Sequence, residues 1–391
     1  MSESQDHSQF QTAKVITLGS VHAVHDTYTA FLPPLLPIFI ANLGLTRAEA
    51  GMLSVFTQAP SVIQPFIGHA SDRRNLNIWV FLAPALAAAL MSTLTLMTSY
   101  LALAVLLTGV GVISAIFHAV GPVITGKLAG RQLGKAMSIW MVGGELGRTL
   151  GPLAIVTAIA HLAPGRVPWI MAVGVAASLW LYLGLRTLPS SSEKHPQQQE
   201  WRGALRKMAP FLLPLSGIIT VRAFLISGLT TYLPTFLTDQ GESLWLAGAA
   251  LTVLQTAGVA GAFMAGSLSD RWGRRKVLRL LMLAAPVLTA LFLGLDGWLR
   301  FPLLLGLGFT VISTTPVVMA MVQENFPENR ALANGVYMCI SFGIRAGAVL
   351  VVGLVGDQWG LATALGGSAA IMALGVLLVN ILPKDKSSTA T

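Results

Sequence analysis

The sequence is poor in charge and in cysteine. Asp, Glu, Lys and Arg make up 10% of the 391 residues, whereas a soluble domain carries roughly 25%. So few charges cannot coat a soluble surface. The single cysteine, Cys339, excludes an intramolecular disulfide and any cysteine-based metal motif. The chain also lacks a Gly-x-x-x-x-Gly-Lys-Ser/Thr phosphate loop and the G-x-S-x-G and H-E-x-x-H motifs. We therefore expect neither an ATP-driven pump nor an enzyme, and no cofactor or resident metal.

Apolar sequence is abundant, at 54% of the residues. A helix that crosses a bilayer needs about 20 apolar residues, and such runs occur at 15–41, 49–70, 78–98, 101–126, 136–161, 167–187, 208–238, 244–268, 277–295, 301–323, 332–356 and 360–382. They predict an all-α integral membrane protein with twelve transmembrane helices. The expected organisation is a tail (1–14), a six-helix bundle (15–187), a polar linker (188–207), a second six-helix bundle (208–382) and a tail (383–391).

The net charge of +9 has a topological interpretation. With both termini and the linker in the cytoplasm, 19 of the 25 basic residues lie on that side, three (Arg47, Arg166, Arg300) lie on the other and three lie inside spans. The positive-inside rule thus predicts cytoplasmic termini in a bacterial cytoplasmic membrane. Residues 1–12 show no cleavage pattern of a signal peptide, and nothing suggests nucleic-acid binding.

An internal repeat divides the chain in two. The stretch from Gly68 to Arg74 recurs, in more complete form, from Gly266 to Lys276. Each copy follows the second expected span of its half, which indicates two related bundles.

This Gly-x-x-x-Asp-Arg-x-Gly-Arg-Arg pattern resembles the loop signature of the major facilitator superfamily. The resemblance implies two six-helix bundles that alternate access to a central site, and a gating motif at the loops. Asn75 and the residues after it replace the usual Gly-Arg-Arg in the first copy. The gating residues that the resemblance implies are Gly68, Asp72, Arg73, Gly266, Asp270, Arg271, Gly273 and Arg274.

The first span contains three titratable residues within five positions: His22, His25 and Asp26. His22 and Asp26, at i and i+4, share a helix face. Ionisable groups at membrane depth are costly and are functional candidates by default. A carboxylate beside an imidazole in a wet cavity can exchange protons near neutral pH, so we expect these residues to couple transport to protons. The alternative is structural: His25 bonds a neighbouring helix and Asp26 caps a broken one.

The fifth span places Glu145 and Arg148 at i and i+3, where they can form an ion pair. Glu145 is a further candidate for proton coupling. Gly147, Gly151 and Pro152 resemble the antiporter signature of the same superfamily, although Ile155-Val156 replaces its paired glycine. A glycine-lined packing face with an internal salt bridge is the alternative.

Two more arginines, Arg222 and Arg345, have no acidic residue within four positions. With Arg148 they outnumber the deep carboxylates Asp26 and Glu145, which favours an anionic substrate; each could instead be a strut between helices. The other candidates for substrate contact are His118, Tyr28, Gln58, Gln255, Trp140 and Tyr232.

The first half also resembles a narrower group, the fosmidomycin-resistance family of efflux carriers. The likeness lies in His22-x-x-His25-Asp26, Gln64-Pro65 with Gly68, Phe117-His118 and the run from Val142 to Pro152. The sequence departs from that family's pattern at His25, Ala119 and Glu145.

Together these features predict a proton-coupled antiporter, working as a monomer, that exports a small anionic or amphiphilic compound such as a fosmidomycin-like phosphonate. The alternative is a uniporter or importer of a nutrient or of a metal ion, the latter held by His22, His25, Asp26 and His118.

Overall fold

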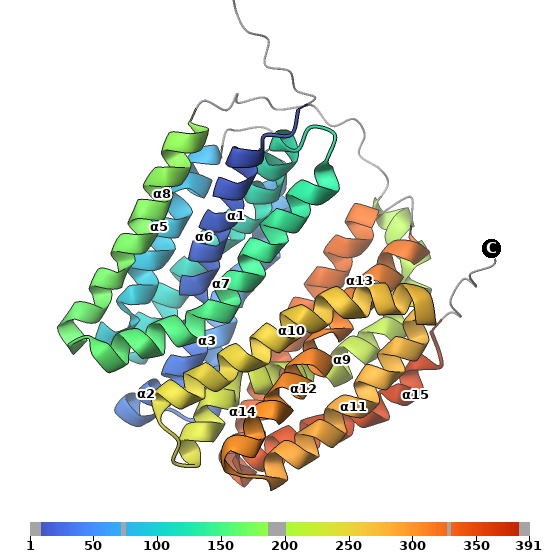
Figure 1. Ribbon diagram of the computed structural model, residues 1–391. Helices are drawn as coiled ribbons and strands as arrows, with labels where there is room; N and C mark the ends of the chain where they lie inside the picture. Colours follow the sequence, from blue (N-terminus) through green and yellow to red (C-terminus); the bar gives the residue numbers. More distant parts are fainter. Residues whose placement is uncertain (1–8, 72–75, 187–200, 327–329, 383–391) are drawn as a thin grey trace, which may run out of the picture. The chain divides into compact units, whose positions relative to one another are not determined.

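A computed structural model describes residues 9–71, 76–186, 201–326 and 330–382 of the chain. These residues form helices and connecting turns, with no strand in the described ranges (Figure 1). Their internal contacts divide the chain into two units. The first comprises Met1–Leu35 and Phe56–His195, and the second comprises Leu36–Val55 and Pro196–Thr391.

The first unit is built around α1, the dark blue helix that runs beside α7 in Figure 1. Helices α5, α6 and α8 also pack on α1. The elements are α1 (Thr12–Thr29), η1 (Ala59–Ile63), α4 (Gln64–Ser71), α5 (Asn77–Ser92), η2 (Leu94–Leu96), α6 (Tyr100–Leu128), α7 (Leu133–His161), η3 (Pro164–Ile170) and α8 (Met171–Leu185). Two further helices, α2 (Leu32–Leu43) and α3 (Arg47–Gln58), contribute residues to both units.

The second unit contains the two longest helices, α9 and α14. Its elements are α9 (Trp201–Asp239), α10 (Leu244–Trp272), α11 (Arg274–Gly294), η4 (Gly297–Leu299), α12 (Arg300–Ile312), α13 (Thr314–Asn325), α14 (Arg330–Leu374) and α15 (Val376–Val379). Gly360 interrupts α14 with a φ of 84°, a left-handed conformation that favours glycine. Two helices therefore meet at Gly360, where the apolar pattern predicts a break between the last two spans.

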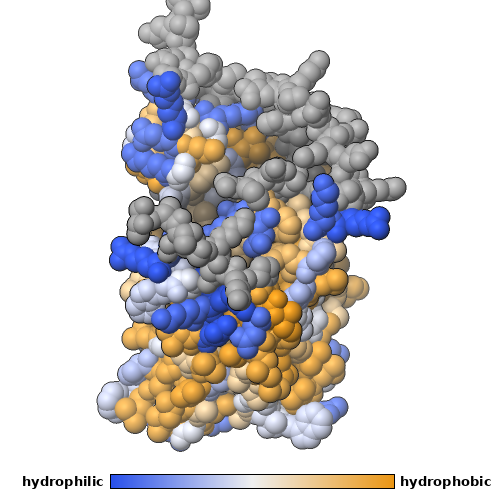
Figure 2. Space-filling view, turned by 90° about the vertical axis from the view of Figure 1, so that its right-hand side faces the viewer, coloured by the Kyte–Doolittle hydropathy of each residue, from blue (hydrophilic) through white to orange (hydrophobic). Residues whose placement is uncertain are grey.

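Much of the described surface is apolar, as a lipid-facing protein requires. Exposed side chains include Phe66, Leu101, Trp169 and Trp298, each more than 70% accessible. Figure 2 shows hydrophobic residues over a large part of one face. Soluble monomers rarely expose apolar patches larger than a few hundred Å², so this surface fits a bilayer.

Eight helical stretches in the described residues are long and apolar enough to cross a membrane. This number is smaller than the twelve apolar runs for identifiable reasons. The turn at Ala30 and Phe31 divides the first run, where the polar residues of the 18-residue α1 lower its hydropathy, and η1 divides the second run into helices that are too short. Glycines and charged residues lower the hydropathy of α7, and α14 contains the last two runs.

Candidate functional site

Glycines at every fourth position of α7 face every fourth residue of α1. A Cβ atom would lie 2.1 Å from the Gly19 carbonyl oxygen at Gly143, 2.3 Å from that of Ala23 at Gly147 and 2.4 Å from that of Thr27 at Gly151. No larger residue fits at these three positions without moving a helix. The glycine run thus allows the two backbones to touch, as small residues do between membrane helices, and this approach positions the polar side chains beside it.

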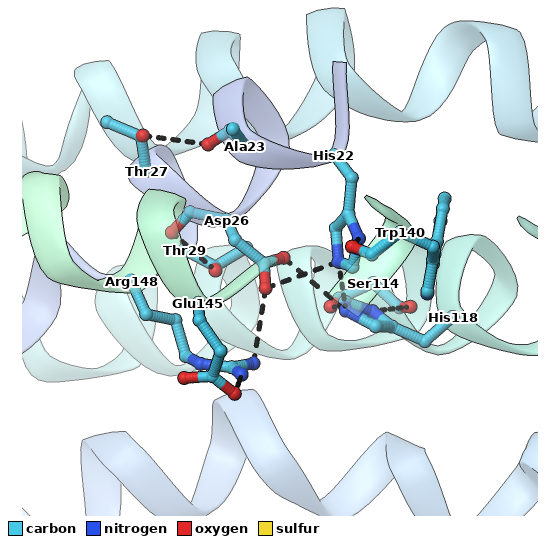
Figure 3. A network of polar contacts seen from close by, with 10 residues as sticks. All are labelled: His22, Ala23, Asp26, Thr27, Thr29, Ser114, His118, Trp140, Glu145 and Arg148. Atoms are coloured by element: carbon cyan, nitrogen blue, oxygen red, sulfur yellow. Dashed lines mark hydrogen bonds and ion pairs between the residues drawn. The ribbon is translucent and has the colours of Figure 1, made fainter. Parts of the chain in front are cut away.

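Asp26 lies at the centre of a polar network formed by α1, α6 and α7 (Figure 3). Its carboxylate is 3.4 Å from Nε2 of His22, 3.4 Å from Nε2 of His118 and 3.2 Å from Nη1 of Arg148. The Asp26 side chain is only 2% exposed. A buried carboxylate persists where partners neutralise it, and here three helices supply them.

The two imidazoles of the network face one another. The Nε2 atoms of His22 and His118 are 3.2 Å apart. Nδ1 of His22 lies 2.8 Å from the carbonyl oxygen of Trp140, and Nδ1 of His118 lies 2.9 Å from that of Ser114. Because a carbonyl only accepts hydrogen bonds, we assign the Nδ1 proton to both rings. The facing Nε2 atoms are then free to share one additional proton.

Arg148 and Glu145 form the accessible end of the network. The Arg148 guanidinium pairs with both Asp26 and Glu145. The Arg148 side chain is 46% exposed and that of Glu145 is 40% exposed. A solute can therefore reach a guanidinium that also neutralises the buried carboxylate.

His25 lies close to the network but contacts it differently. Its ring stacks on Phe117, with centroids 4.3 Å apart, and neither ring nitrogen has a hydrogen-bond partner. The side chain is fully buried. His25 is three positions after His22, about one helical turn, so it lies beside the network, with its ring centroid 5.8 Å from that of His118.

Several predicted substrate contacts engage backbone groups instead. The Tyr28 hydroxyl donates to the carbonyl of Ile170, and the Tyr232 hydroxyl donates to those of Arg47 and Val349. Trp140 is buried against His22. Of the remaining candidates, Gln58, Gln255 and Arg345 are partly buried on α3, α10 and α14 respectively.

Arg222 is 5% exposed in the middle of α9. It donates to the hydroxyl of Thr315 on α13, while its Nε has no hydrogen-bond partner. Within the described ranges no carboxylate forms an ion pair with it at 4.0 Å or less, which is unusual for a buried guanidinium.

The second copy of the gating motif surrounds Arg274. This side chain pairs with Asp270 and with Glu324 of α13, and donates to the Gly266 carbonyl. Gly273, with φ of 92°, makes the turn between α10 and α11, and the neighbouring Arg271 is exposed. In the first copy, Asp72 and Arg73 lie outside the described residues, and Gly68 falls within α4.

Several partners of these residues were not predicted from the sequence. Ser114 is one helical turn before His118 and could have been found from that spacing. Thr315 and Glu324 are far in sequence from the arginines that they contact, and no local pattern points to them.

Among the described residues, His22, Asp26 and His118 form the group whose spacing could hold a metal ion, with ligand atoms within 4.8 Å of one another. Arg148 contacts the same carboxylate at 3.2 Å. Its positive charge opposes a divalent cation at that place but not a proton shared by the imidazoles. The donor set therefore favours a proton.

Comparison with known proteins places the chain among transporters. It matches the family model of the Major Facilitator Superfamily over residues 18–348. The MFS-type transporter YfnC of Bacillus subtilis (strain 168) is 26% identical over 95% of this chain and 93% of its own. The fosmidomycin resistance protein of Escherichia coli (strain K12) is 23% identical over 94% of this chain and 93% of its own.

Solved structures share the fold. The nucleoside transporter NupG aligns with a TM-score of 0.72 at 16% identity, over 94% of this chain and 97% of its own. A bacterial homolog of the human lysosomal transporter Spinster, in an inward-facing and unoccupied conformation, aligns with a TM-score of 0.75 at 16% identity, over 97% and 96%.

The prediction of an all-α membrane protein with the twelve-helix, two-bundle fold is confirmed, as is the prediction that the chain is not an enzyme. It is a multi-pass membrane protein of the kind that binds small molecules and transports them. Since the family model covers most of the sequence, the chain belongs to the Major Facilitator Superfamily.

Proposed function

We propose that this transporter is a proton-coupled antiporter that exports a small anionic or amphiphilic compound. The observation that carries the proposal is the buried Asp26 carboxylate, contacted by two imidazoles and by a half-exposed guanidinium from three helices. We place it in a bacterial cytoplasmic membrane, as a monomer. Both of its termini are placed in the cytoplasm, because this topology puts most of the basic residues on the cytoplasmic side.

The network suits the binding and release of a single proton. With Nδ1 of both rings donating to carbonyls, the facing Nε2 atoms of His22 and His118 repel each other unless a proton lies between them. That proton balances the charges of Asp26, Glu145 and Arg148. Its loss leaves one net negative charge in the network, so proton occupancy changes the local field.

The exposed pair of Arg148 and Glu145 supports cargo binding next to the proton. Guanidinium groups form bidentate hydrogen bonds with phosphonates and carboxylates. By linkage, an oxyanion on Arg148 strengthens proton binding at Asp26, whereas a donor group on Glu145 or Asp26 competes with the proton. Exchange therefore requires a cargo that brings a donor to the carboxylates as well as any oxyanion, which describes a small anionic compound that also carries hydrogen-bond donors.

The relatives support this choice of cargo. The Escherichia coli relative is a fosmidomycin resistance protein. A phosphonate with additional hydrogen-bond donors meets both requirements, and Arg222 and Arg345 are further oxyanion candidates.

The test uses inside-out vesicles and labelled fosmidomycin as the first probe. A proton gradient with the vesicle interior acidic, which drives protons outward, should drive accumulation by the unaltered protein. Asp26→Asn should abolish this accumulation and spare counterflow of preloaded cargo, since only proton coupling is lost. The matched control is Asp296→Asn, because the side chain of Asp296 is 87% exposed and its partner is Arg300. Unchanged accumulation in Asp26→Asn would refute the coupling assignment.

The second candidate function is uptake or uniport. A D-xylose–proton symporter shares the fold, with a TM-score of 0.70 at 17% identity. Accumulation driven by the opposite gradient would identify an importer. Transport indifferent to the gradient would identify a uniporter, and competition by Zn²⁺ or Ni²⁺ at micromolar concentration would identify the metal-ion alternative.

A further inference from the structure

The two facing imidazoles have unequal surroundings. The ring of His22 stacks on the indole of Trp140, with centroids 3.8 Å apart and planes at 28°. The ring of His118 is 6.5 Å from the same indole and nearly perpendicular to it, at 75°. The side chain of His22 is 4% exposed and that of His118 is 28% exposed. One imidazole is enclosed and stacked, while the other reaches the accessible side.

Trp140 is held firmly in this position. Its side chain is 5% exposed. Gly121 on α6 makes room for the indole, because a Cβ atom at Gly121 would lie 2.2 Å from Cη2 of Trp140. The backbone carbonyl of Trp140 also accepts the hydrogen bond from Nδ1 of His22 at 2.8 Å. The same residue therefore fixes both the plane and the tautomer of the His22 ring.

A stacked indole distinguishes the charged imidazole from the neutral one. The negative face of an indole attracts a cation, and the attraction is strongest where water is excluded. The charged or titratable groups around His22 are Asp26 and His25 on its own helix, His118 on α6 and, through Asp26, Arg148 on α7. Helices α5 and α8, which also pack on α1, contain no charged side chain within their bounds.

We infer that Trp140 is a positioning residue that holds the transported proton on His22, and that His118 passes this proton between His22 and the accessible side of the network. The inference rests on the proposed function, since it says where the coupled proton resides. It also changes the expected role of Trp140 from an aromatic wall for cargo to a support for the proton site.

Fluorescence tests the resting position of the proton without any transport. A protonated imidazole in contact with an indole quenches its emission. The chain has nine tryptophans, so the signal of Trp140 is taken as the difference between the unaltered protein and Trp140→Phe. This difference should show a quenching step on acidification of purified protein. The step should disappear in His22→Gln and persist in the control His25→Gln, whose ring lies in the same buried region outside the hydrogen-bonded network.

Persistence of the step in His22→Gln together with its loss in His118→Gln would overturn the inference, as would the absence of any step in the unaltered protein. Retained elution as a folded monomer confirms that each variant is intact.

The pH profile of transport separates positioning from mere packing. Loss of the stack in Trp140→Leu should move the midpoint of gradient-driven transport to lower pH by about 0.5 to 1 unit, with Trp140→Phe between the two. A purely structural role would reduce the rate at every pH without moving the midpoint, and would contradict the inference.

The two proposals fail in different ways. A fluorescence step that depends on His22 in a protein whose transport ignores the proton gradient would refute the antiport function and leave the proton position intact. Gradient-driven transport that depends on Asp26, without a fluorescence step from His22, would support the function and refute the role of Trp140.

Discussion

Gly147 on α7 lies directly against the backbone of Ala23 on α1. A Cβ atom at position 147 would be 2.3 Å from the Ala23 carbonyl oxygen and 2.9 Å from Cβ of Asp26. This approach brings Arg148, the next residue of α7, within 3.2 Å of the Asp26 carboxylate. The glycine therefore has two roles, because helix packing and the assembly of the network depend on the same contact.

Gly147→Ala is expected to destabilise the protein by about 1–3 kcal/mol, since overpacking a close contact costs that much. It should also impair transport, because α7 must move away from Asp26. Gly134→Ala is the matched control: Gly134 lies on the same helix with no atom within 4 Å of a built Cβ. Thermal unfolding in detergent and vesicle transport measure the two effects. Equal behaviour of the two variants would contradict this account.

Arg148→Gln is expected to destabilise the protein by about 1–3 kcal/mol, because it leaves the carboxylate of Asp26 buried with less compensation. The expected loss lies below that of a fully buried pair, since Arg148 is half exposed. Adding Asp26→Asn to Arg148→Gln should recover most of the stability. Glu145→Gln, which alters the exposed partner, should change stability by under about 1 kcal/mol. Additive effects of the two substitutions at Asp26 and Arg148 would show that the pair is not coupled.

Arg222→Met tests whether a buried arginine is kept for function. Within the described residues its Nε has no hydrogen-bond partner and its terminal nitrogen bonds a hydroxyl, so an apolar replacement is expected to be neutral or to stabilise by about 1–3 kcal/mol. Cargo affinity should fall if Arg222 binds an oxyanion.

Arg300→Met is the contrasting variant for that experiment. Arg300 is equally buried at 5% exposure, but it pairs with Asp296 and lies over the rings of Phe236 and Phe292. Its replacement should lower the unfolding midpoint. If Arg222→Met destabilises as strongly as Arg300→Met, then Arg222 is a structural strut.

The local pattern of the first span predicts the central pair of the site. His22 and Asp26 are one helical turn apart, so their contact follows from helix geometry alone. The same geometry places His25, three positions from His22, close to the network, so its stacking on Phe117 outside the hydrogen bonds of that network is not visible in the local pattern. The glycine spacing of α7 likewise predicts a close-packed helix, although the identity of its partner helix is not visible in the sequence.

The remaining network depends on contacts between distant residues. His118 is 96 positions from His22 and Trp140 is 118 positions away, so only the packing of α6 and α7 on α1 brings them together. A tryptophan on a glycine-rich helix could line a cargo site as readily as it could stack on an imidazole. What distinguishes them is the space left by Gly121, which belongs to another helix.

The assignment of residues 36–55 to the second unit also depends on contacts between residues that are distant in sequence. The start of α3 has its own capping box, in which Thr46 and Glu49 exchange hydrogen bonds. This box is visible in the sequence. The carboxylate of Asp357, which accepts the N–H groups of Arg47 and Ala48 at 2.7 and 3.0 Å, comes from 310 and 309 residues away.

Asp357→Asn is expected to weaken the attachment of α3 to α14. The carboxylate satisfies two of the N–H groups that a helix leaves unpaired in its first turn, and its charge complements the positive end of the helix dipole. The neutral amide has one acceptor oxygen and no charge, so the expected loss of stability is about 1 kcal/mol.

Hydrogen exchange reports this loss directly, because the amides of Arg47 and Ala48 should exchange several-fold faster. Asp296→Asn, which removes an exposed carboxylate elsewhere in the second unit, should leave these amides unaffected. Unaltered exchange at both amides in Asp357→Asn would mean that the capping box alone holds the first turn of α3.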